Sequence, residues 1–146
     1  MQNVFYHPII VDDLRNAEKK FNIKTSGNQN KFIAEVLKVA GIDELKAEIF
    51  IKANNNIIKV KGNIKTVVEL TSVVSLEKFK KDYDVNFDMI FDTSLNYQQQ
   101  RELENEGKEA PDIIIEGKID LADIIIEQLA LNIEEYPRID GEEFVF

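Results

Sequence analysis

The stretch that decides the fold is LKAEIFIKANNNIIKVKGNIKTVVEL, residues 45–70. Apolar and polar side chains alternate in both halves, and Phe50 is the exception; this period of two is typical of strands with one dry face and one wet face. The asparagines at 54–56 can adopt the left-handed backbone of a tight turn. The sequence therefore predicts a β-hairpin, whose core side carries Leu45, Ala47, Ile49, Ile51, Ala53, Ile58, Val60, Gly62, Ile64, Thr66, Val68 and Leu70.

A third strand is predicted at residues 83–91, where apolar and polar, mostly acidic, side chains alternate. Its neighbour in the sheet would be the second half of the hairpin, whose wet face carries lysines. Cross-strand pairs of opposite charge contribute about 0.2–1 kcal/mol each. We expect two rows to face each other, Lys59, Lys61 and Lys65 on one strand and Asp82, Asp88 and Asp92 on the other.

Two segments have the apolar period of a helix. Residues 31–40 form the first, and Gly41 is placed to end it. Residues 121–133 form the second, with Asp120 as its N-cap, Asp123 in its first turn and Pro137 beyond its end. The expected core-facing side chains are Phe32, Ile33, Val36, Leu37, Ala40, Leu121, Ile124, Ile125, Ile126, Leu129, Leu131 and Ile133.

The rest of the chain is less regular. Residues 4–11 predict an edge strand interrupted by Pro8, residues 12–21 a short helix capped by Asp12 or Asp13, and residues 22–30 a loop. Residues 94–111 are polar and acidic, which predicts a mobile loop or, at most, a solvated helix. A short strand is expected at 112–116, and the apolar end of the chain at 144–146 is expected to pack.

These elements predict one α+β domain over residues 1–146. It is an antiparallel β-meander, as a twisted sheet or in a barrel-like form, packed against two or three amphipathic helices. The chain of 146 residues, 44% of them hydrophobic, is of the size of one domain with a core.

Composition excludes several classes of function. The 27 acidic and 18 basic residues give a net charge of -9, which argues against a free-standing nucleic-acid binder. The absence of cysteine excludes disulfides and thiolate metal sites. The N-terminus has no signal-peptide pattern and no segment is apolar for the length of a membrane span, so we expect a cytoplasmic protein.

Candidate catalytic residues are few. The only histidine is His7, and a serine hydrolase would have to bring it to Ser72 or Ser75, with no nucleophile-elbow motif to support this. Local turn hydrogen bonds are the more ordinary role for two serines at a strand end. The carboxylates do not form a calcium-loop or glycosidase pattern, and the glycines do not form a phosphate-binding loop. We expect a protein that is not an enzyme and that binds no cofactor or metal.

A resemblance to a known family rests on two separated blocks. VKGNIKTVVELTSVVSLEKF, residues 60–79, keeps Val60, Gly62, Leu70, Thr71, Leu76, Glu77 and Phe79 of a first pattern, and IDLADIIIEQLALNIEEYP, residues 119–137, keeps Ile119, Asp120, Leu121, Glu127, Leu129, Leu131 and Pro137 of a second. With the acidic strand and variable loop between them, they resemble the YceD family of large-ribosomal-subunit rRNA accumulation proteins. The resemblance covers roughly residues 45–137.

The chain departs from that family pattern at several positions. Val74 stands at the pattern's arginine, Lys78 replaces its proline, and the cysteine often seen near the family's C-terminus has no counterpart after Pro137. Ser72 and Ser75 stand where the family pattern has cysteines, and hydroxyl groups are weak zinc ligands compared with thiolates. The resemblance therefore implies a cysteine-free member in which the scaffold is kept for binding.

The resemblance implies a non-enzymatic ribosome-biogenesis factor that supports accumulation of the large-subunit (23S) rRNA, associated with the large-subunit precursor. We expect an adaptor that contacts a basic ribosomal protein or an rRNA-processing nuclease. The contact would use the acidic segment from residue 102 to 112, with Glu102, Glu104 and Glu106, and the acidic end of the third strand. A solvated charge run without a partner is the plainer interpretation of these residues.

Two alternatives remain open. One is an RNA-binding module that uses Lys78, Phe79, Lys80 and Lys81 on a turn between strands, where lysines would hold phosphates and the ring would stack on a base. The plainer interpretation is that Phe79 caps the core. The other alternative is a general protein-interaction domain.

Overall fold

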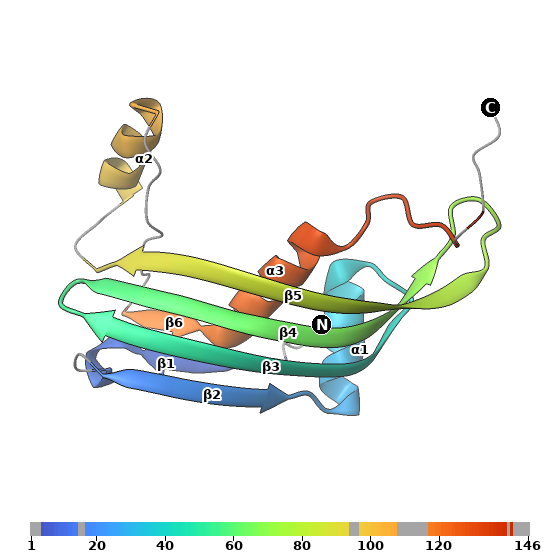
Figure 1. The fold of residues 1–146 in the computed structure, drawn as a ribbon, viewed down its shortest axis with the longest axis horizontal. Helices are drawn as coiled ribbons and strands as arrows, with labels where there is room; N and C mark the ends of the chain where they lie inside the picture. The colour runs from blue at the N-terminus through green and yellow to red at the C-terminus, as the bar shows by residue number, and fades with distance from the viewer. Residues whose placement is uncertain (1–3, 15–16, 94–96, 108–116, 140, 142–146) are drawn as a thin grey trace.

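The computed structural model describes residues 4–14, 17–93, 97–107, 117–139 and 141. It is an α+β fold built on a four-stranded antiparallel sheet in the order β2-β3-β4-β5, beside a small sheet of β1 and β6 (Figure 1). The elements are β1 Pro8–Ile10, η1 Val11–Asp13, β2 Glu18–Lys24, α1 Gly27–Leu37, β3 Gly41–Asn54, β4 Ile57–Thr71, β5 Lys78–Asp92, α2 Tyr97–Asn105, β6 Lys118–Asp120 and α3 Leu121–Asn132.

The predicted hairpin and third strand form the centre of the sheet. Strands β3 and β4 pair from Asn54 and Ile57 onward, and Asn55 has the left-handed φ of 55° that the turn requires. The predicted core residues of β3, β4 and β5 are buried or packed against the core, Thr66 among them, except Gly62, which is half-buried. The expected α+β meander is therefore confirmed, and its sheet is open rather than closed into a barrel.

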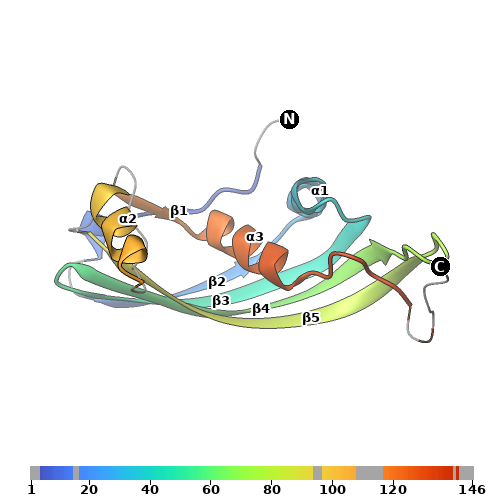
Figure 2. The same ribbon diagram turned by 90° about the horizontal axis from the view of Figure 1, so that it is seen from above.

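Helices α1 and α3 lie on the concave face of the sheet and bury the core between the layers (Figure 2). Ile33 of α1 and Leu121, Ile125 and Leu129 of α3 are fully buried. No described element covers the other, convex face. We call it the open face.

The N-terminal predictions were partly wrong. The expected helix at 12–21 is only a short 3-10 turn followed by β2, in which Phe21 and Ile23 alternate inward against β3. The expected loop at 22–30 contains the end of β2 and the start of α1, which a capping box between Ser26 and Gln29 fixes. Helix α1 ends at Lys38 in a left-handed conformation, and Gly41 begins β3 instead of ending the helix.

The helix at residues 121–132 agrees with its predicted cap. The Asp120 side chain accepts a hydrogen bond from the Ala122 amide at 2.9 Å. The expected core list was too long, since Leu131 is 72% exposed and Val36 of α1 is 44% exposed. These two line a groove of about 760 Å³ between α1, α3 and the end of β4. Ala40 is also exposed, because it lies beyond the end of α1.

The remaining predictions concern the ends and the acidic segment. Of the expected edge strand at 4–11, only β1 is a strand, paired with β6. Within the acidic segment, residues 97–105 form α2, which is the solvated-helix alternative. The expected strand at 112–116 and the apolar tail at 144–146 lie outside the described residues.

Candidate functional site

The structure does not bring His7 to the serines. The ring of His7 packs edge-on against Phe21, at 5.7 Å between centroids, and Phe21 lies level with Gly62 through Ile49. Ser72 follows the far end of β4, ten residues beyond Gly62, which at the rise of a strand is about 30 Å. The arrangement excludes a hydrolytic pair of these residues.

The two serines make the local turn bonds of the plainer interpretation. Ser72 is fully buried, and its Oγ accepts the amides of Val74 at 3.1 Å and Ser75 at 3.2 Å. Ser75 Oγ accepts the Glu77 amide at 3.4 Å. One hydroxyl thus closes the β4–β5 connection, and it needs no metal to do so.

The predicted RNA contact around residue 79 is not a turn. Lys78, Phe79, Lys80 and Lys81 begin strand β5, so Phe79 and Lys81 point to the opposite face from Lys78 and Lys80. Phe79 packs against the core, as the plainer interpretation had it.

Two of these lysines also form ion pairs. Lys80 Nζ pairs with Asp43 at 2.6 Å, and the hydrogen bond and charge of Asp43 raise the pKa of Lys80 above its ordinary value. Lys81 pairs with Glu134 and lies over the ring of Tyr83. The four residues do not form one RNA-binding surface.

The acidic residues of the α2 region are exposed but do not share one side. Glu102 and Glu104 lie on α2, and Glu106 follows its end with its amide bonded to the Glu102 carbonyl at 3.1 Å. Residues four apart on a helix lie on the same side, and residues two apart on nearly opposite sides. Glu102 and Glu106 therefore form one acidic side, and Glu104 forms another.

The open face carries a division of charge that the sequence only partly predicted. Of the two expected rows, Lys61 does lie opposite Asp88, but Lys65 lies opposite Asp84 and Lys59 opposite Ile90. None of the ion pairs formed between described residues joins these two strands on this face. Lys61 and Lys65 therefore each lie opposite an aspartate, as expected, but neither forms an ion pair with it.

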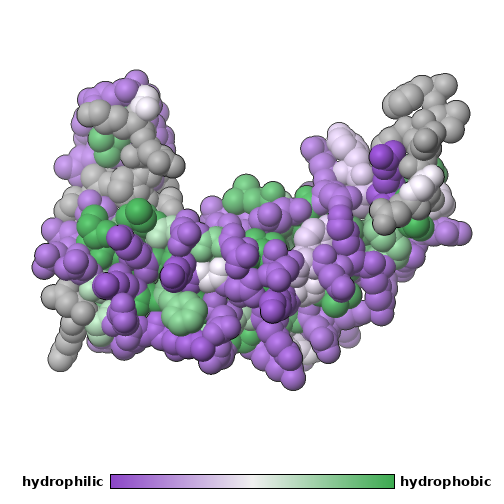
Figure 3. Space-filling view, in the orientation of Figure 1, coloured by the Kyte–Doolittle hydropathy of each residue, from purple (hydrophilic) through white to green (hydrophobic). Residues whose placement is uncertain are grey.

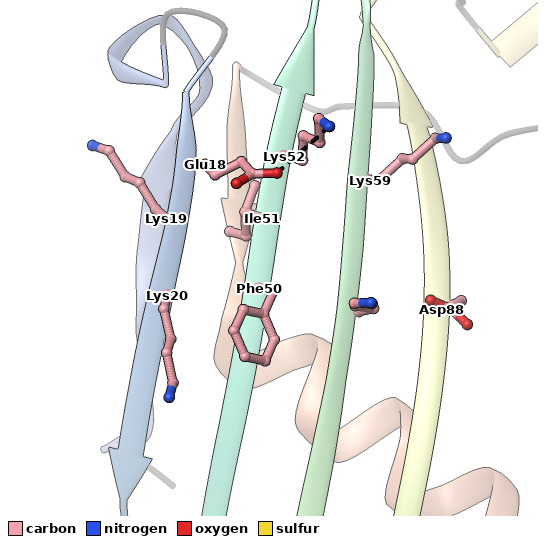
Figure 4. Close-up of a pocket in the computed structure, with 9 residues that line it drawn as sticks. Glu18, Lys19, Lys20, Phe50, Ile51, Lys52, Lys59 and Asp88 are labelled. Carbon is pink, nitrogen blue, oxygen red and sulfur yellow. Dashed lines mark ion pairs between the residues drawn. The ribbon is translucent and has the colours of Figure 1, made fainter.

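Around Phe50, lysines of β2, β3 and β4 form a cluster that sequence reasoning missed. We define the lysine patch as Phe50 with Lys20, Lys52, Lys59 and Lys61, and the acid row as Asp82, Asp84 and Asp88 of β5. Together with Glu18, Lys19, Ile51 and Asp88, the patch lines a hollow of about 830 Å³ (Figure 4). Figure 3, which looks onto the open face, shows a largely hydrophilic surface interrupted by apolar spots. The only signal in the sequence was that Phe50 broke the alternation, and the partner strand β2 was predicted as the end of a helix followed by a loop.

Comparison with protein families was decisive for the second half of the chain. A family model described as "Large ribosomal RNA subunit accumulation protein YceD" matches residues 60–144, which is more than half of the chain. The chain belongs to the YceD family. The expected resemblance is thereby confirmed, and it links the chain to the accumulation of large-subunit rRNA. No curated protein and no solved structure matched the chain.

The YceD match covers β4 from Val60 onward and all of β5, α2, β6 and α3, with the turn at Ser72 and the acid row. It does not include Lys59, nor β2 and β3, which supply Lys20, Phe50 and Lys52 to the lysine patch. The patch is thus completed by the N-terminal part of this chain. No helix in the described part of the chain is long and apolar enough to cross a membrane.

Proposed function

We propose that this protein is a non-enzymatic factor in biogenesis of the large ribosomal subunit, which acts in the cytoplasm by binding components of the subunit precursor. The observation that supports this best is the open face of a YceD-family sheet, on which lysines of β2, β3 and β4 lie beside the acid row of β5. A surface divided in this way favours partners of opposite charge on its two halves.

The acid row and the acidic side of α2 would make the protein an adaptor for a basic partner. Asp82, Asp84 and Asp88 are exposed, and Asp84 and Asn86 both accept from the Asn63 side-chain amide, which orders this part of the row. Glu102 adds charge on the helix that follows β5. A basic ribosomal protein or an rRNA-processing nuclease has the complementary charge, and the net charge of -9 favours its encounter.

The test is to express the tagged protein in its own or a related bacterial cytosol and to separate ribosomal particles on a gradient at low salt. We expect it to sediment with large-subunit precursors, and we expect its deletion to lower the amount of mature large-subunit rRNA. A protein that stays in the free fraction, with unchanged rRNA on deletion, would contradict the proposal.

A variant with Asp82, Asp84 and Asp88 changed to Asn tests whether the acid row contacts the basic partner, separately from the other surfaces of the protein. These substitutions keep the side-chain size and remove only charge. We expect weaker retention on the precursors, and undiminished retention would show that the acid row is not the contact.

A further inference from the structure

The lysine patch has a regular layout across three strands. Phe50 of β3 lies directly between Lys20 of β2 and Lys61 of β4, and one row further along the sheet Lys52 lies opposite Lys59. Neighbouring strands are about 4.8 Å apart, so the four lysines lie at neighbouring positions on the sheet around Phe50. Lys20 Nζ is 5.4 Å from the centroid of its ring. Phe50 is 42% exposed on the convex face, where no described element covers it.

The patch keeps a positive charge although the whole chain is acidic. Lys20 pairs with Glu48 at 2.6 Å and Lys52 with Glu18 at 3.5 Å, which neutralises half of it. Lys59 and Lys61 make no ion pair with described residues. These two lysines lie two residues apart on β4, and Lys61 lies opposite Asp88 of β5. Neither ammonium group is held in an ion pair with a described residue, so both are available to an anion.

The exposed ring distinguishes the kind of anion. The carboxylates of an acidic peptide would pair with the lysines, but they would gain little binding energy from the exposed Phe50. Its ring already has a cation beside it, Lys20 Nζ at 5.4 Å from the ring centroid. A nucleic-acid base can stack on such a ring, and a flat, uncovered sheet with an exposed aromatic and flanking cations is a known way of binding single strands. In a duplex the bases are already stacked on each other and cannot reach the ring.

We propose that the lysine patch binds single-stranded RNA, with a base stacked on Phe50 and the flanking phosphates held by Lys59 and Lys61. This inference rests on the proposed function and names the RNA partner of the same open face. The acid row on β5 borders the site and limits the path of the strand to β2, β3 and β4. The net charge of -9 makes binding modest and strongly dependent on salt.

The test measures binding of a fluorescent oligouridylate of about 12 nucleotides to the purified full-length protein by anisotropy at low salt. We expect Lys59→Glu with Lys61→Glu, and separately Phe50→Ala, to weaken binding about tenfold or more, and Phe50→Trp to preserve it. The matched control is Lys31→Glu with Lys118→Glu, the same charge change on α1 and β6, on the other side of the sheet. It should bind within about twofold of the unchanged protein after a small correction for net charge. Thermal unfolding verifies that each variant is folded.

Two results would overturn the inference: no binding at low salt, or equal losses in the patch and control variants. Duplex RNA bound as well as the single strand, or polyglutamate bound as well as RNA and unaffected by Phe50→Ala, would also overturn it and assign the patch to another partner. Failure of the proposed function is distinguishable, because a protein that sediments with precursors but does not bind RNA loses only this inference. A protein that binds RNA but stays free of the precursors contradicts the proposed function instead.

Discussion

The backbone amide of His7 donates to Asp120 Oδ1 at 2.9 Å, and the same oxygen accepts the Ala122 amide, also at 2.9 Å. A single carboxylate thus caps α3 and holds the start of the N-terminal strand against it. The bond spans most of the chain, and the Leu121 amide returns a bond to the His7 carbonyl at 2.9 Å. The N-terminal segment is therefore part of the same folded unit as the last helix.

Replacing Asp120 by Ala should lower the free energy of unfolding by about 1–3 kcal/mol, because the cap and the His7 amide lose their acceptor together. Asp120→Asn keeps an oxygen in place and is the matched control. Urea unfolding followed by circular dichroism measures both. Equal losses in the two variants would mean that charge, and not the shared acceptor, is what matters.

Gly62→Ala should destabilise the protein by about 1–3 kcal/mol. An added Cβ would lie 2.8 Å from the Glu48 carbonyl oxygen and 2.8 Å from the Phe87 ring, and backbone on a neighbouring strand cannot move aside easily. Gly27→Ala is the control, since a Cβ there meets nothing within 4 Å at the start of α1. The difference in thermal midpoint between the two variants tests the close approach, and equal midpoints would contradict it.

The hairpin and α3 could be predicted because their signals are local: a period of two on either side of three asparagines, and an aspartate directly before an apolar helical pattern. Strand β2 was missed because only Phe21 and Ile23 face inward before the pattern ends, and Lys19 occupies the third inward position. The start of α1 had a usable signal in Ser26 and Gln29, which match the capping box, but the first apolar residue comes later, at Phe32.

The lysine patch could not be predicted, because it depends on pairing between strands that are distant in sequence. Lys20 and Lys61 meet around Phe50 only once β2 adds to the edge of β3. The expected contact at residues 78–81 was wrong for a related reason. Strand β5 pairs with β4 from Lys78 onward, earlier than predicted, so alternate residues of this segment point to opposite faces of the sheet.

Tyr83→Phe should be neutral or stabilising by up to about 1 kcal/mol near neutral pH, because the Tyr83 hydroxyl is buried with no hydrogen-bond partner among the described residues. Burial also raises the pKa of Tyr83 above its ordinary 10.0. The folded state then holds the hydroxyl proton more tightly than the unfolded state. The resulting contribution to the free energy of unfolding is full below pH 10.0 and is lost as the pH rises through the raised pKa. We expect the advantage of the Phe variant in thermal stability to grow above that pH. An advantage that shrinks there would contradict the assignment.

Ser72→Ala should cost about 1–3 kcal/mol, because the amides of Val74 and Ser75 lose a buried acceptor. Ser75→Ala removes only one long bond at an exposed position and should cost less than about 0.5 kcal/mol. The two variants are compared by chemical unfolding. A larger loss for Ser75 would show that the turn is held differently.

Charge reversal on the α2 region should reveal which side of it meets a basic partner. Glu102 and Glu106 lie on one side and Glu104 on the other, so Glu102→Lys with Glu106→Lys reverses one side, while Glu104→Lys reverses the second and is the internal control. If the adaptor contact uses the first side, the double variant should reduce co-sedimentation with large-subunit precursors several-fold, and the single variant should leave it nearly unchanged. Raising the salt should reduce this difference, because exposed charges about 10 Å apart are largely screened at about 0.1 M ionic strength. If neither variant affects co-sedimentation at low salt, these glutamates are a solvated charge run and the basic partner must be held elsewhere, with the acid row of β5 as the remaining acidic surface on the described part of the sheet.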